Sequence, residues 1–390
     1  MHVLFTTPPA PGHVYPTLPL VEELVDRGHH VTYVSGRSLA PELQLAGASV
    51  VDLGWEPNTS ALAATGFTAE TLSADLHAYL AAARLLTPDL LDVIAADPPD
   101  VVCADSVPLG PLVAGIVGAP MISLVPTLAT NTAFTPAELI DGFTPDHPGM
   151  RRYFGELADW FTSYDQPVPH GHPSDSAPVT PSLVFVPKEF QIAGDTFDDS
   201  FHFIGPSVPQ RARQRPPWQP PPDGAPVLLV SLGTAFNNRP DFFASCAEVL
   251  ADSAFHVVMT IGNHVNPAEL GTPAPNIEIH RQLPQLLVLR HAAAFITHAG
   301  MGSVTEALYH QVPTIAVPQA REQAVNAARI DQLGLGARID LPTPNQLRDA
   351  AERVATDPGI RANLAAMKSA INHAGGVSTG VDIIETARTR

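Results

Sequence analysis

The stretch ITHAGMGSVTEALYHQVPTIAVPQAREQ, residues 296–323, contains the pattern that decides the fold of the second half of the chain. It continues the apolar run Ala292–Ile296, which predicts a strand. The glycine-containing turn His298–Ser303 then opens a short helix, and Thr314–Val317 predicts the next strand. A glycine-rich turn that leads into a helix presents unbonded backbone N–H groups and the positive end of the helix dipole. Such an arrangement suits a phosphate group.

Polar side chains in the same stretch have the chemistry to bind the rest of a sugar nucleotide. His298 can donate to a phosphate oxygen, and Glu306 can accept from a ribose hydroxyl. Beyond the second strand, Glu322 and Gln323 are neighbouring acceptors suited to sugar hydroxyls. The stretch therefore predicts a site for a nucleotide that carries a sugar.

Three further stretches support a family resemblance. GHVYPT lies at 12–17, SLGTAF at 231–236 and LPQL at 283–286. With these motifs, in this order before residues 296–323, the chain resembles the inverting UDP-glycosyltransferase superfamily of the GT-B fold (glycosyltransferase family 1). It looks most like the bacterial macrolide and flavonoid glycosyltransferases, and the resemblance covers essentially the whole chain. It implies an α/β fold of two Rossmann-like, doubly wound domains that face each other across a cleft.

Composition narrows the class of protein and its partners. The chain has 390 residues, of which 45% are hydrophobic, so two domains with sizeable cores are expected. The formal net charge of -18 argues against a nucleic-acid partner, which would favour a basic surface. Cys103 and Cys246 are the only cysteines, so neither a disulfide framework nor a zinc cluster is expected.

Targeting signals are not apparent. Met1–Thr7 lacks a basic region and is too short for a signal peptide, and no uninterrupted apolar run has transmembrane length. We therefore expect a soluble, cytoplasmic protein with no membrane partner. The sequence gives no indication of an oligomeric state.

The first half of the chain alternates strands and helices, which predicts a parallel sheet covered on both faces. The expected strands are Val3–Thr7, Val31–Ser35, Val50–Leu53, Val101–Ala104, Met121–Val125, Leu183–Val186 and Phe201–Ile204. The expected helices are Pro16–Arg27, Leu39–Ala46, Ala69–Ala96 and Leu109–Val117. Residues 127–180 interrupt the pattern with prolines and aromatics, as an insertion that lines a binding cleft does.

The second half begins after a proline-rich linker at 209–224. Its expected strands and helices include Val227–Ser231, a helix from Asp241, His256–Ile261, Ile277–His280, a helix from Pro284, and Glu322–Leu333. The predicted domains are residues 1–208 for the acceptor and 225–376 for the nucleotide sugar, followed by a helix at 377–390. The resemblance implies that this last helix crosses back towards the first domain.

Two polar residues follow strands of the first half. His13 lies in a glycine- and proline-rich loop after the first strand, and Asp105 follows the strand Val101–Ala104. Both are therefore expected at the carboxyl edge of the sheet, where open α/β sheets bind ligands. A histidine backed by a carboxylate can remove a proton from a hydroxyl. The resemblance assigns His13 as the general base and Asp105 as its partner; the alternative is two polar loop residues that cap neighbouring helices.

Ser303 and Glu306 have two interpretations. The spacing Ser-x-x-Glu at a helix start is that of a capping box, in which both side chains bond backbone N–H groups. The resemblance instead places Ser303 at the α-phosphate and Glu306 on the ribose, and we favour this role. The full set of donor-binding residues that the resemblance implies is Gly233, Thr234, Leu283, Gln285, His298, Gly300, Gly302, Ser303, Glu306, Glu322 and Gln323. Phe134 and Tyr79 are the candidates for acceptor binding.

The chain departs from the family at two positions. Relatives usually carry a tryptophan, stacked on the uracil ring, where this chain has Gln282, which leaves uridine and thymidine both open as the base. Glu322 stands where many relatives have aspartate, so the preferred sugar can differ as well. The turn around Gly300 and Gly302 lacks the third glycine of a dinucleotide fingerprint, so NAD is rejected.

No metal or other cofactor is expected. The chain has no Asp-x-Asp pair, the usual diphosphate–metal clamp of the other glycosyltransferase fold. His170 and His172 have the spacing of metal ligands but are interpreted as a solvated loop, and His29, His30, His256 and His280 as structural.

Three functions remain open, in this order. The first is an inverting, metal-independent glycosyltransferase that moves a hexose, expected to be glucose from UDP-glucose, to a hydroxyl of a bulky apolar acceptor such as a macrolide or flavonoid. A dTDP-deoxysugar donor is the alternative within this function. The second is a nucleotide-sugar epimerase on the same fold, which would need no acceptor. The third is a binding protein without turnover, against which the His13–Asp105 pair argues.

Overall fold

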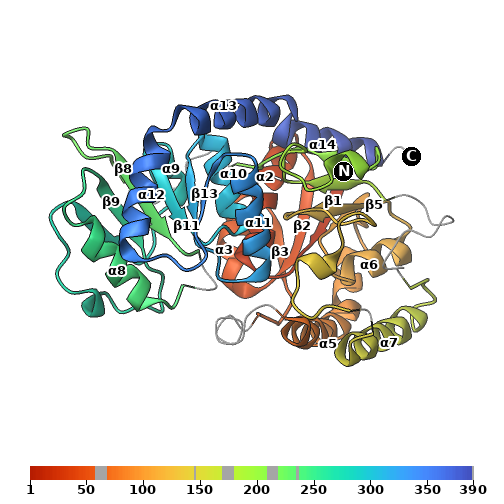
Figure 1. The fold of residues 1–390 in the computed structure, drawn as a ribbon. Helices are drawn as coiled ribbons and strands as arrows, with labels where there is room; N and C mark the ends of the chain where they lie inside the picture. Colours follow the sequence, from red (N-terminus) through yellow and green to blue (C-terminus); the bar gives the residue numbers. More distant parts are fainter. Residues whose placement is uncertain (58–67, 145, 169–179, 209–217, 234–236, 389–390) are drawn as a thin grey trace. The chain divides into compact units, whose positions relative to one another are not determined.

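The computed structural model describes residues 1–57, 68–144, 146–168, 180–208, 218–233 and 237–388 (Figure 1). These residues divide into two compact units. The first unit comprises the described residues from 1 to 208 together with 371–388, and the second those from 218 to 370. Each unit is built on one parallel sheet, as the sequence predicts.

The sheet of the first unit has seven described strands in the order β3-β2-β1-β4-β5-β6-β7, all of them parallel. Their bounds are β1 His2–Thr6, β2 His30–Ser35, β3 Ser49–Asp52, β4 Val101–Ala104, β5 Met121–Val125, β6 Ser182–Val184 and β7 Phe201–Phe203. The helices are α1 Pro11–Val14, α2 Leu18–Asp26, α3 Ala40–Leu45, α5 Ala69–Ile94, α6 Leu109–Val117, α7 Pro148–Thr162 and α14 Gly376–Ala387.

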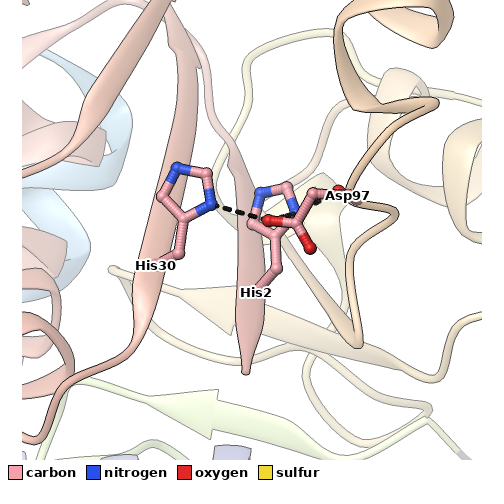
Figure 2. A group of neighbouring side chains, drawn as sticks. All are labelled: His2, His30 and Asp97. Carbon is pink, nitrogen blue, oxygen red and sulfur yellow. Dashed lines mark hydrogen bonds and ion pairs between the residues drawn. The ribbon is translucent and has the colours of Figure 1, made fainter.

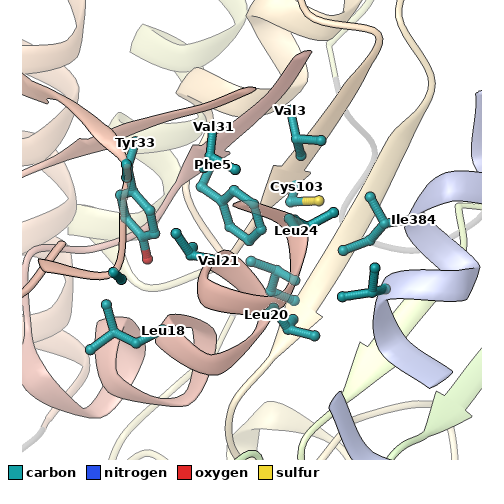
Figure 3. Close-up of a cluster of buried hydrophobic side chains, with 14 of the residues drawn as sticks. Val3, Phe5, Leu18, Leu20, Val21, Leu24, Val31, Tyr33, Cys103 and Ile384 are labelled. Carbon is teal, nitrogen blue, oxygen red and sulfur yellow. The ribbon is translucent and has the colours of Figure 1, made fainter. Parts of the chain in front are cut away.

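Both faces of this sheet are covered. Successive side chains of a strand point to opposite faces, and Val3 and Phe5 of β1 belong to one buried cluster while Leu4 belongs to another. Helix α14 completes the first of these clusters with Val381 and Ile384, both fully buried (Figure 3). Burial on both sides explains why these strands are continuous apolar runs rather than alternating ones.

Ion pairs also attach α14 to α2. Arg27, at the end of α2, bonds Asp382 at 2.6 Å and Glu385 at 3.0 Å, and His29 Nε2 lies 2.7 Å from Glu385. Helix α14 is therefore part of the first unit: its apolar face is buried in the core, and its charged residues form ion pairs at the edge of that contact.

Two segments of the first unit differ from the sequence-based expectation. The helix expected from Pro16 starts earlier, because Pro11 opens α1 and the 3-10 turn Tyr15–Thr17 connects it to α2. His13 therefore lies in a helical turn rather than in a loop. The expected cleft insertion contains the helix α7, whose residues Tyr153, Trp160 and Phe161 are 5%, 4% and 2% exposed. These aromatics fill the core instead of lining a surface.

The second unit has six described strands in the order β10-β9-β8-β11-β12-β13, again all parallel. Their bounds are β8 Val227–Ser231, β9 His256–Thr260, β10 Ile277–His280, β11 Ala292–Thr297, β12 Thr314–Ala316 and β13 Gly336–Arg338. The helices are α8 Pro240–Leu250, α9 Gln285–Leu289, α10 Met301–His310, α11 Arg321–Gln332, α12 Pro344–Thr356 and α13 Pro358–His373, the last ending in residues of the first unit. Among the described residues, no helix combines the length and apolarity needed to cross a membrane.

Candidate active site

His13 and Asp105 meet at the carboxyl edge of the first sheet. The Asp105 Oδ2 atom lies 2.6 Å from His13 Nδ1, a short, charge-assisted distance. The Asp105 side chain is 1% exposed, whereas that of His13 is 36% exposed. The buried carboxylate therefore fixes an imidazole that solvent and a ligand can reach.

The backbone holds Asp105 in place on the neighbouring strand. Thr6 and Ala104 are paired in register at the ends of β1 and β4, and the Asp105 N–H donates to the Thr6 carbonyl at 3.0 Å. The next residue, Ser106, has φ of 47°, a left-handed conformation that non-glycine residues rarely adopt. The chain thus turns sharply directly after Asp105, as strained residues at functional sites often do.

A buried tyrosine anchors the segment that carries His13. The Tyr33 hydroxyl lies 2.8 Å from Thr17 Oγ1 and 3.2 Å from Thr7 Oγ1, on either side of His13 in sequence. Burial raises the pKa of Tyr33 far above its ordinary value, so the hydroxyl stays protonated. Sequence reasoning missed this group, although a tyrosine within an apolar strand indicates that its hydroxyl has a partner.

The pair has the chemistry of a general base. With Nδ1 bonded to the carboxylate, Nε2 on the far side of the ring is the nitrogen that can take a proton. The carboxylate then stabilises the imidazolium that forms. The other carboxylate atom, Asp105 Oδ1, is buried and has no hydrogen-bond partner among the described residues.

The two acceptor-binding candidates are buried. Phe134 is 1% and Tyr79 2% exposed, so neither presents an aromatic surface in this structure. Burial is the main cause that raises the pKa of Tyr79, and the negative charge of Asp105 contributes. Tyr79 therefore belongs to the surroundings of the His13–Asp105 pair, while its role towards an acceptor stays a prediction.

In the second unit, His298 lies between two glycine backbones. Ser231 and Thr297 are paired in register at the ends of β8 and β11, which places the two following turns side by side. A Cβ atom at Gly233 would lie 2.5 Å from His298 Cε1, and one at Gly300 would also overlap the ring. Only glycine leaves room for the imidazole at both positions. Burial lowers the pKa of His298 to about 4, so the ring is neutral at physiological pH and donates a single N–H.

Two asparagines that sequence reasoning missed hold these turns. Asn237 Nδ2 donates to the Gly233 carbonyl at 2.8 Å. Asn326 Nδ2, on α11, donates to the carbonyl of Ala299 at 3.0 Å, where φ is 62°. Asn326 lies 27 residues from Ala299 in sequence, and the spacing of four residues between Gly233 and Asn237 belongs to no motif, so neither residue was marked by the sequence.

Helix α10 begins at this turn, with Gly300 as its N-cap and no side-chain cap. The backbone N–H groups of its first turn have no partner within the helix. A Cβ atom at Gly302 would meet nothing within 4 Å, so space is open on that side. The capping box considered for Ser303 and Glu306 is not formed, because the helix starts before Ser303.

Gln285 connects those two residues instead. Its Nε2 atom donates to Ser303 Oγ at 3.2 Å and to Glu306 Oε2 at 2.7 Å. The amide of α9 thereby holds the hydroxyl and the carboxylate on the same side of α10. Leu283, two residues earlier, packs partly buried against the core of the second unit.

The remaining donor-binding candidates lie on α11 or outside the described residues. Glu322 Oε1 accepts from Asn326 Nδ2 at 3.0 Å. Gln323 is 3% exposed and its Oε1 accepts from the Gln319 N–H at 2.8 Å, so this amide shapes the turn before α11. Thr234 lies outside the described residues, as do His170 and His172.

The chain has two parallel-sheet Rossmann-like units, one with a histidine–carboxylate pair and one with a glycine-framed helix N-terminus. The comparisons with known proteins name the class of enzyme that has these features. The family model described as UDP-glucoronosyl and UDP-glucosyl transferase matches residues 222–377. The chain belongs to this family and is a glycosyltransferase.

Relatives and solved structures match over nearly the full length. An NDP-glycosyltransferase, YjiC, of Bacillus subtilis (strain 168) is 32% identical, with 98% of this chain and 96% of the relative covered. Demethyllactenocin mycarosyltransferase of Streptomyces fradiae is 34% identical, with 98% and 86% covered. The crystal structure of the glycotransferase of kitacinnamycin matches with a TM-score of 0.84 and 32% identity, over 99% of this chain and 98% of that one. The fold is therefore that of the GT-B glycosyltransferases.

Proposed function

We propose that the protein transfers a hexose from a nucleoside diphosphate sugar to a hydroxyl group of a bulky, largely apolar natural product such as a macrolide or flavonoid. The transfer is inverting and needs no metal ion. The observation that carries the proposal is the 2.6 Å contact between His13 Nδ1 and Asp105. It prepares His13 to remove the proton of the attacking hydroxyl.

At the anomeric carbon, the reaction breaks one bond and forms one. The acceptor oxygen bonds the anomeric carbon as its proton passes to His13 Nε2, and the bond between that carbon and the diphosphate oxygen breaks with its electron pair. The transition state has oxocarbenium character, as in glycoside hydrolysis. An α-linked donor gives a β-glycoside.

The leaving diphosphate gains negative charge, and the second unit offers donors for it. The N–H of neutral His298, the Ser303 hydroxyl and the first-turn N–H groups of α10 are preorganised hydrogen-bond donors. Each such donor is worth about 3 kcal/mol when it is aimed at developing charge. This supports charge stabilisation by the protein itself rather than by a metal.

Glu306 and Glu322 are proposed to bind the ribose and the sugar hydroxyls. Both carboxylates are held by an amide, from Gln285 and Asn326 respectively. We propose UDP-glucose as the donor. A dTDP-sugar is the alternative, because Gln282 is exposed at the position where an aromatic ring would select the base. The relative from Streptomyces fradiae, a mycarosyltransferase named for demethyllactenocin, supports a natural-product acceptor.

A mass-spectrometric assay in the presence of a chelator tests the proposal. UDP-glucose and dTDP-glucose are offered separately with a panel of macrolides and flavonoids. A mass gain of one hexose on an acceptor is expected, and the better donor reports the base preference. Donor isomerisation without an acceptor would instead identify an epimerase. Full activity only after metal is restored, in a protein whose Tm the chelator leaves unchanged, would overturn the metal-independent mechanism.

Gly233→Ala is expected to weaken binding of the nucleotide by at least about 10-fold, because its Cβ displaces the His298 ring from the diphosphate. Gly224→Ala is the matched control: its φ of 74° equals that of Gly233, but its Cβ would meet nothing within 4 Å. Both variants carry the strain of a left-handed alanine, about 1 kcal/mol. Calorimetric titration with UDP and dTDP separates them; equal affinities in the two variants would remove His298 from the donor site.

A further inference from the structure

A second cluster of ligand-type side chains lies at the opposite edge of the first sheet. His2 and His30 are paired in register on β1 and β2, so they occupy the same face of neighbouring strands. Their rings stack with centroids 4.4 Å apart. Asp97, in the segment between α5 and β4, points its carboxylate at both rings (Figure 2).

The three side chains converge closely enough for one ion. Asp97 Oδ2 lies 3.0 Å from His30 Nδ1 and 3.6 Å from His2 Nδ1, and the three ligand atoms are all within 4.8 Å of one another. A tetrahedral zinc ion with bonds of ~2.0–2.2 Å holds neighbouring ligand atoms about 3.3–3.6 Å apart. His30 and Asp97 are 50% and 65% exposed and have room to rotate towards this geometry, whereas His2 is 3% exposed and stays in place.

The surroundings favour a cation on these atoms. His2 Nε2 lies 2.9 Å from the buried Thr32 hydroxyl, a contact that orients the ring with Nδ1 towards Asp97. His2 Nδ1 also lies 2.6 Å from the backbone carbonyl oxygen of Asp97, and a metal ion bound to Nδ1 would replace this contact. A second carboxylate, Asp100, accepts from the His2 N–H at 2.8 Å and adds negative charge beside the cluster.

We propose that His2, His30 and Asp97 bind a divalent transition-metal ion of the zinc class through two imidazole nitrogens and one carboxylate, with water completing the coordination. This donor set suits zinc rather than magnesium, which favours oxygen ligands alone. The ion joins β1, β2 and the segment before β4, so its effect is on the stability of the first unit.

The proposed site is separate from the catalytic pair. Strand β1 runs from His2 to Thr6, and at ~3.3 Å per residue its ends lie about 13 Å apart. His13 and Asp105 follow the opposite end of these strands. Zinc binding and sugar transfer are therefore measured independently, and failure of one leaves the other standing.

Isothermal titration of the full-length, chelator-treated protein with zinc chloride tests the site. One equivalent is expected to bind, magnesium is expected not to compete, and zinc is expected to raise the Tm. His30→Ala and Asp97→Asn are each expected to weaken zinc binding at least about 10-fold. His280→Ala is the matched control, because it removes a 34% exposed histidine that also pairs with a carboxylate, Glu278, at 2.8 Å.

Two results would overturn the site. Either zinc fails to bind the wild-type protein, or it binds the His30 and Asp97 variants as tightly as the wild type. A purely hydrogen-bonded cluster is the competing explanation. It predicts that these two variants lower the Tm in chelator while zinc leaves the Tm of the wild type unchanged.

Discussion

Replacing His13 with alanine is expected to lower the turnover of sugar transfer by about two to four orders of magnitude, the usual contribution of a positioned general base. The imidazole is held by Asp105 at 2.6 Å and is 36% exposed, so its removal leaves the buried carboxylate without the base that an acceptor can reach. Affinity for the nucleotide is expected to stay nearly unchanged, because the proposed diphosphate donors belong to the second unit. Steady-state kinetics and calorimetric titration with UDP measure the two quantities.

The control for this variant is His264→Ala, which removes an exposed histidine outside both proposed sites. It should retain the wild-type rate. A His13→Ala protein that kept most of its turnover would refute the general-base assignment, whereas loss of turnover together with loss of nucleotide affinity would indicate misfolding rather than missing chemistry.

The strands were the most predictable part of the fold. Val101–Ala104, Met121–Val125, Val227–Ser231 and Ile277–His280 have the predicted bounds. Val101–Ala104 and Val227–Ser231 are buried throughout, and strands that are buried on both faces need a continuous apolar run. Ile277–His280 is an edge strand, in which apolar and polar residues alternate. The sequence pattern and the physical constraint coincide there.

Helix starts were less predictable, and one pattern shows why. At Ser303 the Ser-x-x-Glu spacing suggested a capping box, but α10 begins earlier because Thr297 Oγ1 accepts from the Ala299 N–H and turns the chain there. At Thr343 the equivalent spacing to Gln346 does form a capping box and opens α12, which sequence reasoning did not assign. The spacing alone does not distinguish Ser303, where no capping box forms, from Thr343, where one does. The turn that precedes each helix makes the difference.

The candidate site was predictable as far as it depends on strand ends. His13 and Asp105 follow strands of the first sheet, Gly233 and His298 follow strands of the second, and topology brings each pair to one edge of its own sheet. The supporting contacts of Tyr33 and Asn326 were not predictable, because each depends on packing between elements whose separation in sequence carries no pattern. Asn237 lies only four residues from Gly233, but no motif marks that spacing.

Aromatic residues were misleading for a related reason. Phe134, Tyr153 and Trp160 suggested a ligand-binding surface, but apolar side chains at helical spacing in α7 are equally suited to the core. These residues are buried and form part of the core of the first unit. Residues that contact an acceptor therefore have to be found by experiment rather than from aromatic content.

Asp105→Asn is expected to lower turnover by about two to four orders of magnitude as well, although it changes the shape of the side chain very little. The amide removes the negative charge that stabilises the His13 imidazolium, and it can donate to Nδ1 and so move the ring proton to Nε2, the atom that must accept one. Steady-state kinetics measure the loss of turnover, and a Tm equal to that of the wild type shows that the fold is retained. A variant that kept most of its turnover would refute the role assigned to the carboxylate.

The double variant separates a positioning role from an independent one. Asp105 is 1% exposed and touches the reaction only through His13, so its effect requires the imidazole. His13→Ala combined with Asp105→Asn is therefore expected to be about as slow as His13→Ala alone, since groups that act as a unit are not additive. Rate losses that multiplied in the double variant would mean that Asp105 contributes to transfer by a route of its own, and the pair would no longer describe the mechanism.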